Sequence, residues 1–379
     1  DSVTLVGYRA GYQMSGSNTF VGYSSGYGSV SSAPYGSGEH NTALGHNTLY
    51  NLSTGHSNVA VGYTAGGAVT TGGQNVLVGY SAGSSITTGT HNTAIGYQAL
   101  DVNVEGDYNT CIGSGAGGGF NNTGNDHNTC IGYNAGTGGN NQDVDDIVAI
   151  GSEALTNIDN NGADGTVAIG RSALKALTFA TGNVAIGYQA GLRHTSGAGC
   201  VYIGHNAADH CTDGHRNVAI GEASLSGNAD DDNVAVGYGA LGVCLSADNV
   251  AIGTNAGNTI STGAENTLVG YNVDVASEDN TNNIVLGNNL TATDKDNAVF
   301  IGNDTNHIEN DFNADATWNY SSDVRQKKEI EDDTLGLDFI NKIRPVVYKH
   351  KSPSEFPKEW SAYNGDDKND LFTYGIGGL

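Results

Sequence analysis

Tyrosine recurs at one fixed position of a short phrase that is repeated along this 379-residue chain, directly after a glycine, as in "NTAIGY". An aromatic side chain at regular spacing can stack on its neighbours in adjacent repeats, or it can offer its ring face to a sugar. We expect a stacking ladder, and a track for sugars is the alternative. The tyrosines at this position are Tyr8, Tyr23, Tyr63, Tyr80, Tyr97, Tyr133, Tyr188, Tyr238 and Tyr271.

Three acidic segments, "QDVDDI", "NADDDN" and "DKDN", hold carboxylates at a density that could bind Ca²⁺. None matches the nonapeptide pattern of RTX proteins, so we expect solvated loops and no metal site. His40, His91 and His127 lie in loops without a matching serine and aspartate, and no pair of carboxylates can be placed for glycan hydrolysis. We therefore expect no turnover enzyme and no cofactor.

The elements that carry these residues are themselves repeated. The glycine that follows an apolar pair occurs 18 times, and nine of the 17 intervals are 17 residues long, the others running from 15 to 23. A short, fixed period is typical of a solenoid with one supersecondary unit per repeat. These glycines are Gly7, Gly22, Gly45, Gly62, Gly79, Gly96, Gly113, Gly132, Gly151, Gly170, Gly187, Gly204, Gly221, Gly237, Gly253, Gly270, Gly287 and Gly302.

Each position of the phrase has a structural explanation. A small residue followed by a β-branched one, as in Ala94-Ile95, suits a short strand. The glycine turns the chain where a Cβ would obstruct or where φ must be positive, and the variable polar remainder forms loops. A period of 17 residues is too short for two helices. We therefore expect an all-β chain, a parallel β-roll or β-helix solenoid of about 18 short coils stacked roughly 4.8 Å apart.

Composition divides the chain near residue 321. Residues 1–321 hold 29 Asp+Glu against 6 Lys+Arg, a net charge of −23, whereas residues 322–379 hold 11 against 9 and three of the four prolines. The acidic shaft argues against binding to nucleic acid, which requires basic patches. No run of 18 apolar residues exists, so we expect no membrane insertion.

Five cysteines are present. Cys111 and Cys130 occupy the position that alanine usually fills in neighbouring repeats, which predicts small core residues rather than a disulfide. Cys200, Cys211 and Cys244 do not have the spacing of metal ligands.

A coil made largely of alanine and glycine buries little apolar area by itself, and self-association would bury more. The repeated phrase resembles the head repeats of trimeric autotransporter adhesins, and more closely the glycine-rich repeats of phage tail fibres, over residues 2–305. Its period is longer than that of the adhesin heads. The resemblance implies that the chain is a homotrimer.

A different pattern follows the last repeat. Leu335, Phe339, Ile340 and Ile343 fall on one face of a short helix, and the apolar run 346–348 predicts a strand. We therefore expect a small α+β segment at the C-terminal end.

Ser322, Asp323, Arg325, Lys327 and Ile330 match the opening "SDxRxKxxI" of the endosialidase-type intramolecular chaperone, and "GLDFINKIRPVVYKHK" resembles its continuation. The resemblance implies that residues 322–379 form the N-terminal part of a domain that assists trimerisation and then cuts itself off. It also implies cleavage between Ser322 and Asp323, with Lys327 as the partner of the serine.

The chemistry of such a cleavage has more than one route. A serine hydroxyl needs a base to become a nucleophile, and a desolvated lysine can supply one. Ser322 is poorly placed to attack its own carbonyl group, so attack could come from a neighbouring chain or from the carboxylate of Asp323. The alternative to a catalytic role is a structural one, in which Ser322 or Asp323 caps the start of a helix.

These observations predict a β-roll shaft over residues 1–306, a linker over 307–321 and a chaperone segment over 322–379. The resemblance implies a phage tail fibre on the virion tail, made in the host cytoplasm, that binds a glycan or protein of the host cell surface. A bacterial trimeric surface adhesin or extracellular filament is the alternative, and it would carry a membrane anchor in place of the chaperone.

Overall fold

A computed structural model describes residues 2–28, 36–120, 124–138, 144–158, 163–313, 344–349 and 372–377. The chain divides into two units, Asp1–Tyr320 and Ser321–Leu379. All regular secondary structure in the described residues is β, and none of them lies in a helix.

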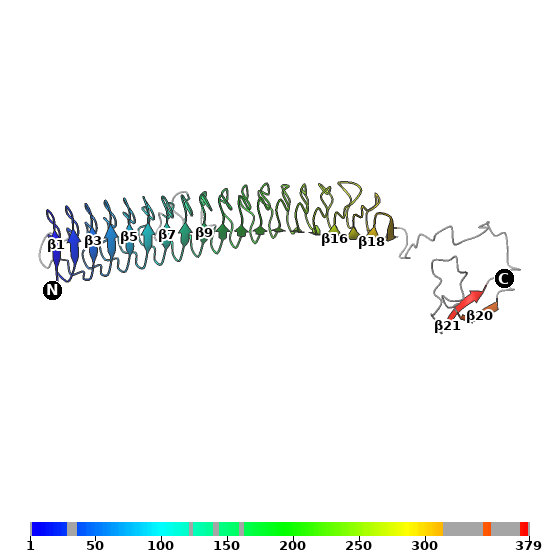
Figure 1. Cartoon of the computed structure of the whole chain (residues 1–379), viewed down its shortest axis with the longest axis horizontal. Helices are drawn as coiled ribbons and strands as arrows, with labels where there is room; N and C mark the ends of the chain where they lie inside the picture. The colour runs from blue at the N-terminus through cyan, green and yellow to red at the C-terminus, as the bar shows by residue number, and fades with distance from the viewer. Residues whose placement is uncertain are drawn as a thin grey trace, which may run out of the picture. The chain divides into compact units, whose positions relative to one another are not determined.

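The first unit is a row of short strands that stand side by side, one per repeat (Figure 1). Fifteen of them are only three residues long. The glycine of the repeated phrase directly follows each of these strands. The strands are β1 Thr4–Val6, β2 Thr19–Val21, β3 Thr42–Leu44, β4 Val59–Val61, β5 Val76–Val78, β6 Thr93–Ile95, β7 Thr110–Ile112, β8 Thr129–Ile131, β9 Val148–Ile150, β10 Val167–Ile169, β11 Val184–Ile186, β12 Val201–Ile203, β13 Val218–Ile220, β14 Val234–Val236, β15 Val250–Ile252, β16 Thr267–Tyr271, β17 Ile284–Asn288, β18 Ala298–Asn303 and β19 Asn306–Asp311.

Each strand from β1 to β17 pairs in parallel with the next strand in sequence, so β18 is the last strand of the parallel series. The register places equivalent residues beside each other, for example Ala168 beside Ala185 and Ile169 beside Ile186. Since the chain travels once round the solenoid between successive strands, these 18 strands enclose about 17 coils. The predicted parallel β-solenoid is therefore confirmed, and the count of repeats exceeded the number of complete coils by one.

The last strand of this unit runs the other way. β19 pairs antiparallel with β18, with Ile301 beside Ile308. β19 begins at Asn306, the last residue of the predicted shaft, and its other residues lie in the segment 307–321 that lacks the repeated phrase and is predicted as a linker. It covers the end of the parallel sheet, where an unpaired strand edge would otherwise be exposed.

In two neighbouring coils the interior is filled by two positions whose sizes compensate. One is the middle residue of the strand and the other lies four positions after the glycine. Ala94 is combined with Leu100 in one coil, whereas Leu77 is combined with Gly83 in the preceding coil, and all these apolar side chains are buried. A Cβ added at Gly83 would lie 2.6 Å from Cδ2 of Leu77, so two large residues do not fit together.

A column of buried asparagines holds successive coils together at the start of the strands. The backbone N–H and the Nδ2 of Asn75 both donate to Oδ1 of Asn58 at 3.0 Å, and its Nδ2 also donates to the carbonyl of Gly89 at 2.9 Å. Its own Oδ1 accepts the N–H of Asn92 at 2.9 Å. The members of this asparagine column are Asn18, Asn41, Asn58, Asn75, Asn92, Asn109, Asn128, Asn183, Asn217, Asn233, Asn249, Asn266 and Asn283.

The glycine of the phrase forms the corner at the other end of the strand. Gly187 has a φ of 141°, and a Cβ added there would lie 2.3 Å from the carbonyl oxygen of Gly204 in the next coil. Both reasons proposed from the sequence therefore apply at this residue: the φ is unfavourable for other residues, and the backbone of the neighbouring coil is too close.

The second unit contributes one described pair of strands. β20 (Arg344–Lys349) pairs antiparallel with β21 (Phe372–Gly377). The strand predicted at 346–348 is confirmed by β20. The predicted helix containing Leu335, Phe339, Ile340 and Ile343 lies outside the described residues.

Candidate functional site

The outer face of the strands carries an apolar stripe, formed by the first and third residues of successive strands. The middle residue points into the coil, so these two point outward. Parallel, in-register pairing then stacks valine on valine and isoleucine on isoleucine, as in β9 to β11. Ile95, Ile186 and Ile252 remain 37%, 38% and 41% exposed. A continuous row of half-exposed β-branched side chains is typical of a surface that binds another protein surface.

The residues after the corner glycines form a ring ladder in the first six coils. Tyr8, Tyr23, His46, Tyr63, Tyr80 and Tyr97 stack in this order. Ring centroids are 5.0–5.2 Å apart and adjacent ring planes differ by 10–21°. The predicted stacking is thus confirmed for these coils. Stacking covers the ring faces, which are the surfaces that sugars use, and leaves mainly edges and hydroxyl groups exposed.

The ladder ends where the sequence places a serine. Ser114 follows Tyr97 in this column, and Tyr133 stands between Ser114 and Ser152. Farther along, Tyr188 stacks on His205 at 5.2 Å, and the guanidinium of Arg171 lies 5.7 Å from the Tyr188 ring centroid. The predicted ladder is therefore interrupted rather than continuous.

Two further ring stacks were not anticipated from the sequence. Tyr12, Tyr27 and Tyr50 stack at 5.5 and 4.9 Å, and the guanidinium of Arg9 lies 5.6 Å from the Tyr12 ring centroid. His91, Tyr108 and His127 form another stack at 4.5 and 5.1 Å. The residues of the second stack directly precede the asparagine column, in "HN" and "YN". Those of the first stack each lie five positions after a corner glycine. Both positions belong to the variable segments that are predicted as loops.

The cysteines are buried and free. Cys111 and Cys130 are register partners inside the coil, which confirms the prediction of small core residues. A hydrogen bond with Cys111, together with burial, raises the pKa of the Cys130 thiol well above its ordinary value. Burial raises the pKa of Cys211 to about 11. At neutral pH these thiols are protonated and have little nucleophilic character.

His194 is a core residue rather than a ligand or a base. Its Nε2 lies 2.6 Å from the carbonyl oxygen of Gly197, and its Nδ1 lies 3.3 Å from the hydroxyl of Tyr202. Burial lowers the pKa of His194, so the neutral imidazole is favoured in this apolar setting.

The carboxylates of the acidic loops accept hydrogen bonds from loop backbone N–H groups and form ion pairs with basic side chains. Arg216 pairs with Asp231 at 3.1 Å and with Asp232 at 2.6 Å, and Asp296 accepts the N–H of Thr281 at 2.8 Å. Within the described coils, no group of three or more His, Cys, Asp or Glu side chains is arranged to hold a metal ion.

The candidate cleavage residues Ser322, Asp323 and Lys327 lie outside the described residues. β20 and β21 belong to the "RPVVYK" and "FTYGIG" segments of the same proposed chaperone region. The roles that the sequence resemblance implies for these three residues stay predictions.

A comparison with protein-family models finds no family whose model matches this chain, and a comparison with curated proteins finds no significant match. Among the residues that the structure describes, there is no helix of the length and apolar character needed to span a membrane.

Proposed function

We propose that this chain is a structural and adhesive fibre of the phage tail-fibre type, which assembles as a homotrimer and attaches to a host cell surface. Its C-terminal segment would act as a self-cleaving chaperone for trimerisation. The proposal draws on the sequence resemblance and on the solenoid of stacked coils, a fold compatible with a structural or adhesive role.

The apolar stripe is the observation that carries the proposal. The chain has a net charge of −25, yet valine and isoleucine follow one another along the outer face of the strands. Burying this stripe against the same stripe of other copies removes apolar area from water at roughly 25 cal/mol per Å². The resemblance selects three copies rather than two.

Light scattering on the purified protein tests the assembly. We expect a particle of three times the chain mass of 38.9 kDa. The double substitution Ile186→Asp and Ile220→Asp places charges in the stripe and should dissociate the particle. Phe179→Asp is the matched control, since Phe179 is 56% exposed but lies outside the strands. A wild-type monomer that is stable in dilute solution would contradict the proposal.

Attachment is tested separately with fluorescently labelled protein and a panel of bacterial strains. We expect saturable binding to some strains, removed by an excess of unlabelled protein. Equal, non-saturable binding to every strain would contradict a role in host attachment.

Self-cleavage is tested by intact mass spectrometry after expression of the full-length gene. We expect two products, with a new N-terminus at Asp323, and a single uncut chain for Ser322→Ala. Lys327→Ala should slow the cleavage if the lysine supplies the base. Cleavage of Ser322→Ala at the same bond would exclude the serine as the nucleophile and favour the carboxylate of Asp323.

A further inference from the structure

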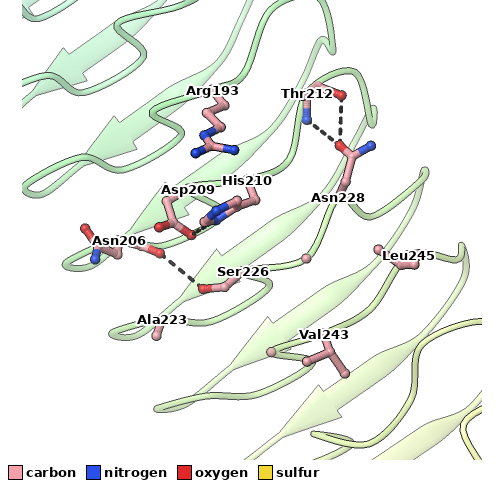
Figure 2. A pocket seen from close by; sticks show the side chains of 12 residues that line it. Arg193, Asn206, Asp209, His210, Thr212, Ala223, Ser226, Asn228, Val243 and Leu245 are labelled. Carbon is pink, nitrogen blue, oxygen red and sulfur yellow. Dashed lines mark hydrogen bonds and ion pairs between the residues drawn. The ribbon is translucent and has the colours of Figure 1, made fainter.

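A groove lies in the loops of the coils between β11 and β15, where one column of side chains is interrupted. Arg193, His210 and Val243 occupy equivalent positions in three coils, and the coil between His210 and Val243 has Gly227 there. Gly227 packs on the next coil, since an added Cβ would lie 2.1 Å from the carbonyl oxygen of Cys244. A groove of about 610 Å³ lies beside Gly227 (Figure 2). This volume is sufficient for a small ligand.

One wall of the groove carries a guanidinium that is free to bind an anion. Arg193 is exposed and makes no ion pair with another described residue, whereas Arg216 is paired with two aspartates. A guanidinium binds a carboxylate through two parallel hydrogen bonds. The acidic loops of other coils are screened over about 8 Å at physiological ionic strength, so the charges that line the groove decide. These are Arg193 and the Asp209 carboxylate, and Asp209 is hydrogen-bonded to His210.

Two further groups on this side are held in fixed orientations. The Asp209 carboxylate lies 3.0 Å from Nδ1 of His210, which leaves Nε2 for a ligand hydroxyl group. Oδ1 of Asn228 accepts both the N–H and the hydroxyl of Thr212 at 2.8 Å, so its Nδ2 remains available as a donor. Figure 2 shows these side chains around the same opening.

The opposite wall is apolar. Val243 and Leu245 project from the loop between β14 and β15 and are each 49% exposed. The two walls together favour a ligand that has an anionic group at one end and a methyl or acetyl group at the other.

The loop backbone argues against an extended peptide as the ligand. Strand addition requires unpaired backbone groups along an edge. Here three backbone N–H groups of the loops are already paired. The N–H of Thr195 donates to the carbonyl oxygen of Thr212, and the N–H of Leu245 donates to the carbonyl oxygen of Ser261. The N–H of Thr212 donates to Oδ1 of Asn228. Side chains are therefore the groups that remain for recognition, and their mixed donors and acceptors suit hydroxyl groups.

We propose that this groove binds a saccharide unit that carries both a carboxylate and an acetyl or methyl group. Arg193 binds the carboxylate, His210 and Asn228 bind hydroxyl or carbonyl groups, and the methyl group packs against Val243 and Leu245. The inference deepens the proposed attachment role. It rests on that role in one respect only, that the saccharide comes from a host cell surface.

Ligand-observed NMR titration of the intact protein tests this with three sugars. N-acetylmuramic acid has both groups, N-acetylglucosamine lacks the carboxylate, and glucuronic acid lacks the acetyl group. We expect N-acetylmuramic acid to bind at least tenfold more tightly than the other two. Arg193→Gln should lower its affinity to that of N-acetylglucosamine, and Val243→Ser should weaken both acetylated sugars while sparing glucuronic acid.

Arg171→Gln is the matched control, because Arg171 lies over Tyr188 and not in the groove. Equal affinities in Arg193→Gln and Arg171→Gln, no binding of any of the three sugars, or tighter binding of an acidic peptide would each overturn the proposal. The outcome is independent of attachment: protein that adheres to cells but binds none of the sugars refutes the groove alone. Protein that binds N-acetylmuramic acid but adheres to no cell refutes the attachment role alone.

Discussion

Two columns of the same repeat behave in opposite ways. The asparagine column is enclosed and keeps one residue type in most coils, whereas the column that follows the corner glycine is exposed and contains tyrosine, histidine, serine, arginine, glutamate and threonine. An enclosed side chain bonds to the equivalent residues of two neighbouring coils, so a change breaks two contacts at once. An exposed side chain can change without that cost. Binding chemistry is therefore expected where columns vary, as in the loops around Gly227.

The largest effect should come from the corner glycine. Gly187→Val combines a φ of 141° with a Cβ only 2.3 Å from a backbone oxygen, and we expect it to cost roughly 3 kcal/mol or more. Thermal unfolding followed by circular dichroism measures this. Gly182→Ala is the control, because Gly182 also has a positive φ but no atom within 4 Å of an added Cβ. Equal melting temperatures for the two variants would show that the close approach of the coils is unimportant.

The next largest effect should follow from a break in the asparagine column. Asn75→Ala leaves the N–H of Asn92 and the carbonyl of Gly89 without their side-chain partners, which costs about 2–4 kcal/mol. Asn75→Thr should recover part of the loss, since Thr166 bonds to the carbonyl of Ala180 from the equivalent position. Urea unfolding measures the free energy of unfolding of the alanine and threonine variants. An alanine variant as stable as the threonine variant would contradict the role of the column.

The compensation of sizes inside the coil predicts a coupled pair. Ala94→Leu alone should overpack the coil and cost about 1–3 kcal/mol, and Leu100→Gly alone should leave a cavity. The double variant reproduces the combination of Leu77 with Gly83 in the preceding coil. We expect it to be more stable than the sum of the single effects, by double-mutant-cycle analysis of unfolding. Additive effects would show that the two positions do not share one space.

A smaller effect is expected in the exposed ring ladder. Tyr63→Ala removes stacking on His46 and on Tyr80, each at 5.1 Å, and should cost about 1 kcal/mol. Tyr133→Ala, between two serines, should cost less in the same thermal unfolding measurement. A loss as large as that of Asn75→Ala would remove the distinction between enclosed and exposed columns.

The smallest effect should come from the exposed ion pair. The hydrogen bond from Arg216 lowers the pKa of Asp232, so the folded state binds the proton of this carboxyl more weakly than the unfolded state. The stabilisation is therefore present above the ordinary Asp pKa of about 3.9 and is lost as the pH falls through the lower folded value. Arg216→Gln should lower the melting temperature slightly at pH 7 and not at all in strong acid. A difference that persists in acid would exclude the ion pair as its cause.

The repeat itself was sufficient to predict the shaft. Glycine after a small and a branched residue, at intervals near 17, predicts a parallel solenoid because a strand, a corner and a loop must recur at a constant rise. The ring ladder and the buried cysteines also follow from position alone, since register places equivalent residues side by side. The asparagine column was missed, because asparagine before a strand is equally typical of a turn.

The sequence alone therefore determined which residues share a column, because the period fixes the register of neighbouring coils. It did not determine that the asparagine column faces inward, how the sizes of Leu77 and Gly83 are matched, or that a groove lies beside Gly227. Those features depend on how closely the backbones of adjacent coils approach, and on which way each loop residue turns. Only the folded arrangement decides them, because side chains far apart in the sequence compete there for the same space.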